Sequence, residues 1–284
     1  MKDFPAVINS FLVWLQKSDV KGKYQFYHRT KKLLGERYIV HSGKSHFAVP
    51  YDQWCFWKTF GPEGYYLEEM LPFCQLLENE LEDFVFFDLG ADVGVVANLV
   101  SIHCPALTQI FAFEPNPKSF ELLKLNSEMS KLPFRAEHQA VSSFEGKVKF
   151  SFDSTVASDH EGHIKVEESG NTPVTSLDFF VANNEIALPK ELVIKIDVEG
   201  QELEVIKGAK RIISASEKTI ILLEIHPDTL ERDNLSPEAI FEELEKIREV
   251  KWHVPLLNKN IDRSKNFFDQ FPLQQYDVIA IAED

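Results

Sequence analysis

The feature that most constrains this chain is a pair of apolar runs, each of which ends in an acidic residue. Residues 84–87 are all apolar and lead into the acidic, glycine-containing stretch 88–94, and a second apolar run at 110–113 ends in Glu114. Such runs are typical of strands buried on both faces of a parallel sheet, and glycines allow a tight turn into the next helix. The pattern therefore predicts the strand, turn, helix and strand that open a Rossmann-like α/β domain.

The glycines of this turn bear on the ligand that it accepts. Dinucleotide-binding turns carry three glycines, spaced Gly-x-Gly-x-x-Gly, so that the backbone can approach a pyrophosphate. This chain has only Gly90 and Gly94, with Asp88 before them and Asp92 between them. Carboxylates repel a pyrophosphate, whereas S-adenosylmethionine has no phosphate and carries a sulfonium and an ammonium cation. The turn therefore favours S-adenosylmethionine over a nicotinamide dinucleotide.

The turn is expected to lie where ligands of open α/β sheets bind, beyond the carboxyl ends of the strands. We expect Asp88 to bind the ammonium group, directly or through water, and Glu114 to accept hydrogen bonds from both ribose hydroxyls. The helix after Gly94 would receive the cofactor's carboxylate at its N-terminus. The alternative is an ordinary strand–turn–helix in which Asp88 only caps the helix. The predicted cofactor-binding residues are Asp88, Gly90, Ala91, Asp92, Gly94, Glu114, Pro115, Gln139 and Asp197.

Five polar residues at the ends of the fourth and fifth core strands form the predicted catalytic set. Side chains alternate along a strand, so Lys195, Asp197 and, if strand geometry continues, Glu199 point the same way. Glu224 and His226 share a face of the neighbouring strand by the same rule. His226 is the predicted general base, because the unperturbed pKa of histidine is about 6.5. The alternative is a structural ion-pair network that fixes the strand ends.

Three of these acids could also bind a metal ion, because Asp197, Glu199 and Glu224 offer the oxygen ligands that Mg²⁺ prefers. A divalent cation is the less favoured expectation, and no metal-binding residue is predicted. His160 and His163 are spaced for a metal too, but they lie in a polar hairpin, where we expect them to be exposed to solvent.

From residue 84 onward, strands alternate with helices, which predicts a parallel sheet covered on both faces. We expect the seven-stranded, mostly parallel sheet of a class I methyltransferase, closed by an antiparallel strand pair. The expected strands are 84–89, 109–114, 134–141, 192–197, 219–225, 250–254 and 276–282, with an additional hairpin of 147–153 and 163–168. The expected helices are 67–81, 94–103, 117–129, 201–213 and 237–248. Ser236 is the expected N-cap of the last helix and Pro237 its first residue.

The first 80 residues differ from the rest in their aromatic and basic content. We expect residues 1–80 to form an extension with helical and aromatic segments that binds the acceptor or covers the site, and residues 81–284 to form the methyltransferase domain. Aromatic rings can stack on sugars, and four of them stand just before the core: Trp54, Trp57, Tyr65 and Tyr66.

Composition narrows the range of partners and compartments. The net charge of −15 over 284 residues argues against nucleic acid, which demands a basic surface. The three cysteines, Cys55, Cys74 and Cys104, form no paired motif and predict a reduced, cytoplasmic protein. Residues 4–15 are too short for a bilayer, which takes about 20 apolar residues, and predict an amphipathic helix. A position near the inner membrane surface and a homo-oligomeric state are both left open.

Together these segments resemble the FkbM-type family of S-adenosylmethionine-dependent methyltransferases. The resemblance extends from residue 65 to residue 226 and is carried by FFDLGADVG, FAFEPNPKSFELLKLN, AVSSFEGKVKF, PVTSLDFF, VIKIDVEGQELEVIKGAKRII and ILLEIHP. It implies the class I methyltransferase fold and O-methylation of hydroxyls on glycans, polyketides and similar small molecules.

The resemblance also implies roles for individual residues. It places Asp88, Gly90 and Gly94 in the cofactor loop, Glu114 on the ribose, and Asp197, Glu199 and Glu224 near the methyl group. Asp92 departs from the asparagine that is usual in the family, and its added charge could strengthen ammonium binding or repel the cofactor's carboxylate.

The predicted function is the transfer of a methyl group from S-adenosylmethionine to a hydroxyl of a sugar, glycan or related small molecule. The protein would hold the acceptor oxygen about 3 Å from the methyl carbon, in line with the leaving sulfur. One alternative is a non-catalytic methyltransferase-like assembly or interaction subunit, which the aspartate at position 92 leaves open. A nicotinamide-dependent oxidoreductase is the less favoured alternative. The acceptor, and O- against N-methylation, stay open at this stage.

Overall fold

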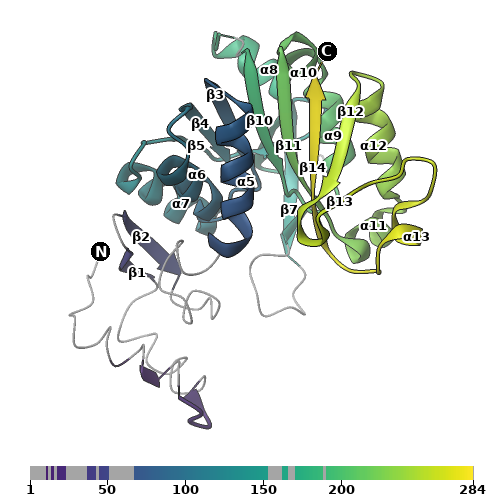
Figure 1. Ribbon diagram of the computed structural model, residues 1–284. Helices are drawn as coiled ribbons and strands as arrows, with labels where there is room; N and C mark the ends of the chain where they lie inside the picture. Colours follow the sequence, from purple (N-terminus) through teal and green to yellow (C-terminus); the bar gives the residue numbers. More distant parts are fainter. Residues whose placement is uncertain are drawn as a thin grey trace.

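A central sheet with helices on both faces forms the main body of the protein (Figure 1). The computed structural model describes residues 11, 14–15, 18–23, 37–42, 45–50, 67–152, 162–165, 170–187 and 190–283. The helices α5, α6 and α7 cover one face of the sheet, and α8, α9, α10 and α12 cover the other. The bounds of these helices are Leu67–Glu80, Val95–His103, Pro117–Met129, Leu177–Asn183, Glu202–Gly208, Lys210–Ala215 and Pro237–Glu245.

The strand order of the main sheet is β13-β12-β14-β11-β10-β3-β4-β5. The strands are β3 (Phe84–Leu89), β4 (Leu107–Phe113), β5 (Arg135–Glu137), β10 (Glu191–Ile196), β11 (Lys218–Ile225), β12 (Val250–Val254), β13 (Lys259–Asn260) and β14 (Tyr276–Glu283). Strands β5, β4, β3, β10 and β11 are parallel, and β14 is antiparallel to both of its neighbours, β11 and β12. The sheet has eight strands rather than the predicted seven, because the two-residue β13 extends its edge.

The side chains of β3 explain why its sequence is apolar at every position except Asp88. All six residues are buried, and alternate positions enter different hydrophobic clusters. Phe84 and Phe86 pack under α5 and α6, whereas Val85, Phe87 and Leu89 pack under the helices of the opposite face. A strand between two helical layers has no solvent-exposed face, so both alternating sets must be apolar.

One predicted helix, 201–213, is two helices in the structure, because α9 ends at Gly208 and α10 begins at Lys210. The carboxylate of Asp178, on α8, accepts hydrogen bonds from the amides of Arg211 (2.8 Å) and Ile212 (2.9 Å). These amides lie in the first turn of α10, where no intrahelical partner exists. A cap supplied from another helix therefore allows a separate helix to begin, a feature that cannot be read from residues 201–213 alone.

The predicted start of α12 is confirmed by its cap. The Ser236 side chain accepts a hydrogen bond from the amide of Ala239, and Pro237 occupies the first turn. Ile240, Phe241 and Leu244 lie on one face of the helix and are buried.

The predicted strand 134–141 is also divided, between two sheets. β5 ends at Glu137, whose carbonyl accepts a hydrogen bond from the amide of Gln139 (3.0 Å), so the chain turns at once. Residues 140–141 then form β6, in a smaller sheet of order β6-β9-β7-β8. The other strands of that sheet are β7 (Gly146–Phe152), β8 (Gly162–Lys165) and β9 (Thr172–Thr175). The expected hairpin is confirmed by the antiparallel pairing of β7 with β8, and His163 lies on β8.

The extension contributes a hairpin of β1 (Arg37–Ser42) and β2 (Ser45–Pro50). Phe47, Ala48 and Val49 of β2 are fully buried in the same core as α6 and β3. The aromatic residues predicted to contact an acceptor, together with Cys55 and His160, lie outside the described residues, as does most of the predicted helix 4–15. The boundary after residue 80 stays a prediction, although α5 packs into the shared core.

Cys74 and Cys104 are free cysteines buried in the hydrophobic core. Of the helices in the described ranges, none combines the length and the apolar character needed to cross a membrane.

Candidate active site

The turn between β3 and α6 is held between two neighbouring strands. The amides of Gly90 and Ala91 both donate to the carbonyl of Phe113, at 3.1 and 2.9 Å. Gly90 has a φ of +73°, and a Cβ atom at this position would lie 1.7 Å from the carbonyl oxygen of Asp197. Any side chain at position 90 would therefore push the turn away from β10, which explains the need for glycine.

Glu114 lies at the end of β4 with its carboxyl group fixed by the backbone. Its Oε2 accepts a hydrogen bond from the amide of Asp92 (2.8 Å), and its Oε1 accepts one from the amide of Asn116 (2.7 Å). Burial, followed by the charge of Asp92, raises the pKa of Glu114 to about 8. Asp92 has a φ of +46°, a left-handed conformation that Asn and Asp tolerate better than most residues. The aspartate therefore fits the backbone conformation of this turn.

Lys195 joins three elements beneath the turn. Its Nζ donates to Oδ2 of Asp197 (2.7 Å) and to the carbonyl of Gly90 (3.2 Å), and lies 3.7 Å from Oδ1 of Asp88. Burial lowers the pKa of Lys195, but Asp197 and Asp88 outweigh it and the net shift is upward. These are the contacts that the alternative of an ion-pair network predicts. The catalytic role predicted for Lys195 stays a prediction.

Asp88 is fully buried, which bears on its predicted contact with the ammonium group. Its Oδ2 accepts a hydrogen bond from the amide of Ala97 (3.2 Å) in the first turn of α6. Burial raises the pKa of Asp88, while Lys195 opposes that shift. The helix contact matches the capping alternative, and binding to the cofactor stays a prediction.

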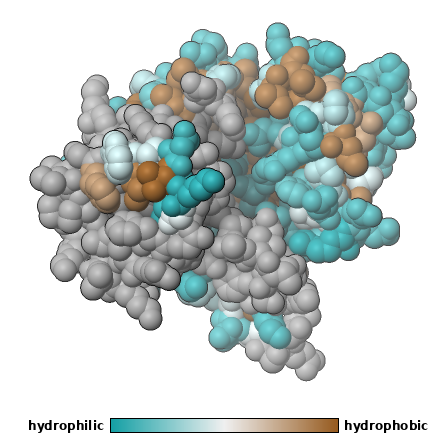
Figure 2. All heavy atoms as spheres, turned by 90° about the horizontal axis from the view of Figure 1, so that it is seen from below, coloured by the Kyte–Doolittle hydropathy of each residue, from teal (hydrophilic) through white to brown (hydrophobic). Residues whose placement is uncertain are grey.

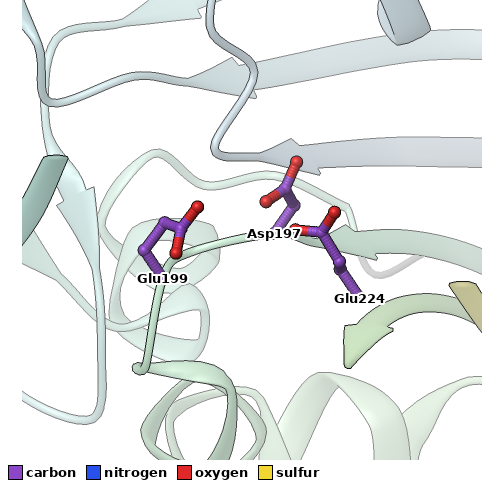
Figure 3. Close-up of side chains that lie close together, drawn as sticks. All are labelled: Asp197, Glu199 and Glu224. Carbon is purple, nitrogen blue, oxygen red and sulfur yellow. The ribbon is translucent and has the colours of Figure 1, made fainter. Parts of the chain in front are cut away.

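Asp197, Glu199 and Glu224 come together at the carboxyl ends of β10 and β11 (Figure 3). One carboxylate oxygen from each lies within 4.8 Å of the others. The strand does not continue to Glu199, which has a φ of +51°, but the turn still brings its side chain to the group. The hydroxyl of Thr229 donates to Oε2 of Glu199 (3.0 Å), and Arg232 donates to its carbonyl (2.6 Å).

Glu224 interacts with a residue that the sequence did not indicate. The side-chain amide of Gln275 donates a hydrogen bond from its Nε2 to Oε1 of Glu224. Burial, and next the charge of Asp197, raises the pKa of Glu224 to about 10. Asp277, on β14, lies directly opposite Glu224, so Gln275 is the diagonal neighbour of Glu224. No local pattern at residue 275 signals this contact, because it depends on the pairing of strands more than 50 residues apart in sequence.

His226 lies next to this group of acids, as predicted. It precedes α11 (Pro227–Asp233), is half-buried, and interacts electrostatically with Glu199. Its Nδ1 is buried and has no hydrogen-bond partner in the described ranges. No hydrogen bond from the His226 ring to the carboxylate of Glu199 or Glu224 is found among the described residues.

The last two predicted cofactor residues lie at adjacent strand ends. The carbonyl of Pro115 is 3.2 Å from Nε2 of His138, whose ring stacks on Phe120 at a centroid distance of 4.6 Å. Gln139 follows directly, at the turn between β5 and β6. Pro115 and Gln139 therefore lie side by side beyond β4 and β5, next to Glu114.

The sheet order and the position of the acidic residues at its carboxyl edge define a class I methyltransferase fold. A family model, the Methyltransferase FkbM domain, matches residues 88–250. The chain belongs to the FkbM methyltransferase family.

Individual proteins similar to the chain include hexuronic acid methyltransferase AglP of Haloferax volcanii, which is 34% identical over 151 residues. That alignment covers 53% of this chain and 59% of the relative, so the chain spans less than two thirds of the relative's length.

Two solved structures are also similar. Methyltransferase FkbM from Methylobacillus flagellatus has a TM-score of 0.44 and 18% identity, over 81% of this chain and 53% of that one. The SAM-dependent methyltransferase from Agrobacterium tumefaciens has a TM-score of 0.45 and 10% identity, over 88% of this chain and 71% of that one.

Proposed function

We propose that the protein transfers a methyl group from S-adenosylmethionine to a sugar hydroxyl of a glycan. The observation that carries the proposal is the glycine turn held against β10 beside the fixed carboxyl group of Glu114. The turn approaches the ligand through backbone alone, and Glu114 retains lone pairs for two ribose hydroxyls. Asp88 and Asp92 give the site a negative character that suits a cationic cofactor and opposes a pyrophosphate.

The name of the relative AglP supports a sugar acid as the acceptor to be tried first. Figure 2 views the molecule from the end at which the parallel strands terminate, and the coloured part of that face is mostly hydrophilic, with separate hydrophobic spots. A sugar, which is itself polar, suits a hydrophilic face better than a purely apolar acceptor does.

S-adenosylmethionine would supply an electrophilic methyl group next to the acids at the ends of β10 and β11. The protein's tasks are to position the acceptor hydroxyl and to accept its proton. His226 is the proposed base, because it interacts electrostatically with Glu199 and the unperturbed pKa of histidine is near neutral. The proton leaves the hydroxyl as its oxygen bonds to the methyl carbon, and the sulfur departs with the electron pair of the broken bond.

We propose that no metal ion takes part, although Asp197, Glu199 and Glu224 lie close enough to share one. Lys195 already donates to Asp197, and Gln275 donates to Glu224. A cation would have to compete with both donors. Unchanged turnover after treatment with a chelator supports this proposal, and activity that is lost and then restored by Mg²⁺ contradicts it.

The first test is a calorimetric titration with S-adenosylmethionine, followed by transfer of a labelled methyl group. Glycans that end in a hexuronic acid would be compared with matched neutral glycans. Binding together with transfer to a sugar hydroxyl supports the proposal. A folded protein that does not bind S-adenosylmethionine contradicts it, and binding without transfer to any glycan favours a non-catalytic subunit.

Replacing His226 by alanine should lower kcat by about 100-fold, the lower end of the range for a general base. The Kd for S-adenosylmethionine should not change, since His226 is not among the proposed contacts of the cofactor. The matched control is His253→Ala, a half-buried histidine on β12 that contacts Asn260. Near-normal turnover of the His226 variant would exclude the histidine as the base.

Binding of S-adenosylmethionine should strengthen as the pH rises toward 8. The pKa of Glu114 is raised to about 8 by burial and then by Asp92, so the carboxyl group of the free protein is mostly protonated at pH 6. A protonated carboxyl group cannot accept both ribose hydroxyls, so binding requires loss of that proton. We expect Kd to decrease about tenfold from pH 6 to pH 7 and to level off above pH 8. Titrations across this range test the prediction, and a constant Kd would contradict it.

A further inference from the structure

Asn126, on α7, connects the N-terminal hairpin to the turn between β3 and α6. Its Oδ1 accepts a hydrogen bond from the amide of Ala48 (2.6 Å), and its Nδ2 donates to the carbonyl of Ala48 (3.0 Å). The same Nδ2 donates to the carbonyl of Val93 (2.7 Å). One carboxamide therefore binds both backbone groups of a β2 residue and one backbone group of the turn.

These hydrogen bonds lie in a dry environment and fix the carboxamide in one orientation. Asn126 and Ala48 are fully buried, and Val93 is also inaccessible to solvent. Both amide protons of Asn126 are in use, and its oxygen has an acceptor role. A flipped or displaced carboxamide would leave buried backbone groups unpaired, which is costly in such a place. The turn and the hairpin therefore cannot move independently of Asn126 without breaking these bonds.

A second contact joins α7 to the same turn. Gly94 has a φ of +87°, and a Cβ atom there would lie 2.8 Å from the side chain of Leu123, one turn before Asn126 on α7. Phe47 and Val49, on either side of Ala48, are fully buried in the core that also contains Val93. The hairpin, α7 and the turn are thus packed as one unit.

We propose that Asn126 is a positioning residue of the cofactor site, which couples docking of the β1–β2 hairpin to binding of S-adenosylmethionine. The proposal rests on the proposed function, since it takes residues 90–94 as the cofactor turn. Coupling is reciprocal, so a ligand that fixes the turn must stabilise the docked hairpin. Loss of docking must then lower the affinity for that ligand by the same factor. The hairpin leads directly into residues 51–66, where the sequence places the four aromatic side chains expected to contact an acceptor. The coupling would therefore favour acceptor binding after the cofactor is bound.

The test is hydrogen exchange of the wild-type chain with and without S-adenosylmethionine. We expect the cofactor to slow exchange in a peptide that covers residues 45–50 by at least about fivefold, with the amide of Ala48 as the reporter. Exchange must slow more in residues 45–50 than in α12, because any ligand slows exchange throughout a protein by stabilising its folded state. Cofactor binding with no additional protection of residues 45–50 would overturn the inference.

Asn126→Asp provides the matched variant, because it keeps the size and the acceptor but removes both donors. We expect its affinity for S-adenosylmethionine to fall about tenfold and the additional protection of residues 45–50 to disappear. The control is Asn98→Leu, since Asn98 is an equally buried asparagine on α6 whose side chain makes no hydrogen bond in the described part of the chain. The Asn98→Leu control should keep both the affinity for S-adenosylmethionine and the additional protection of residues 45–50. Normal affinity and normal protection in a folded Asn126→Asp variant would overturn the inference.

The two proposals fail in different ways. If the wild-type chain does not bind S-adenosylmethionine, the proposed function fails and the coupling falls with it. If the wild-type chain binds the cofactor but residues 45–50 exchange as before, only the coupling is wrong.

Discussion

Replacing Glu114 by alanine will lower the affinity for S-adenosylmethionine by about 1,000-fold. The variant loses the acceptor for two ribose hydroxyls, and hydrogen bonds to a charged group contribute about 1.5–3 kcal/mol each. It also leaves the amides of Asp92 and Asn116 without the carboxylate that orients the turn. A loss of about 4 kcal/mol corresponds to a Kd about 1,000-fold higher, which calorimetry would register as absent binding.

Two further variants distinguish loss of the ribose contact from a general loss of folding. Glu114→Gln keeps one acceptor oxygen, so it should bind weakly and without the pH dependence expected of the wild-type chain. Glu121→Ala removes an exposed glutamate from α7 and should bind normally. If Glu114→Ala folds and binds within tenfold of the wild-type affinity, the assignment of the ribose contact is wrong.

Replacing Lys195 by methionine should lower the free energy of unfolding by about 4 kcal/mol, because removal of one partner leaves buried charge uncompensated. The ammonium group of Lys195 contacts Asp197, Asp88 and the carbonyl of Gly90, all beneath the turn. Methionine has a similar length, so packing is largely kept while the charge is lost. Denaturation with urea at pH 7 measures the effect.

An exposed lysine on the same segment provides the control. Lys190 pairs with Glu217 at 3.0 Å, but both side chains are mostly exposed, and solvent screening leaves such an ion pair with little effect on stability. Lys190→Met should therefore have little effect on the free energy of unfolding.

The double variant Lys195→Met with Asp88→Asn should recover part of the stability lost in Lys195→Met, since it removes one of the unpaired acids. If Lys195→Met lowers the free energy of unfolding by less than about 1 kcal/mol, the buried ion pairs of Lys195 do not stabilise the fold as proposed.

The strands of the main sheet could be predicted because burial acts on each residue of a strand directly. A run such as 84–87 is apolar at every position because both faces of its strand are covered, and the sequence shows this without reference to any other segment. The start of α12 was predictable for the same local reason, since Ser236 and Pro237 stand in the chain next to the helix that they begin.

Two short helices outside the expected set, α8 and α11, also have local signals in the sequence. Ser176 caps α8 through the amide of Phe179, and Pro227 opens α11 directly after His226. Both are helix-start signals that precede a short segment, and short segments are easily assigned to loops. The division of 201–213 into two helices had no such signal within that segment, because its cap, Asp178, lies on another helix.

The sequence by itself determined the α/β class, the strands that bear the site, and the residues at their carboxyl ends. These properties follow from burial and from alternation along single segments. Only the tertiary structure decided how those residues are used: that Lys195 bridges Asp88 and Asp197, that Gln275 reaches Glu224, and that Asn126 holds Ala48 and Val93 together. Each of these contacts joins separate segments of the chain or depends on how they pack. Their energies depend on burial that exists only after the sheet and helices have assembled.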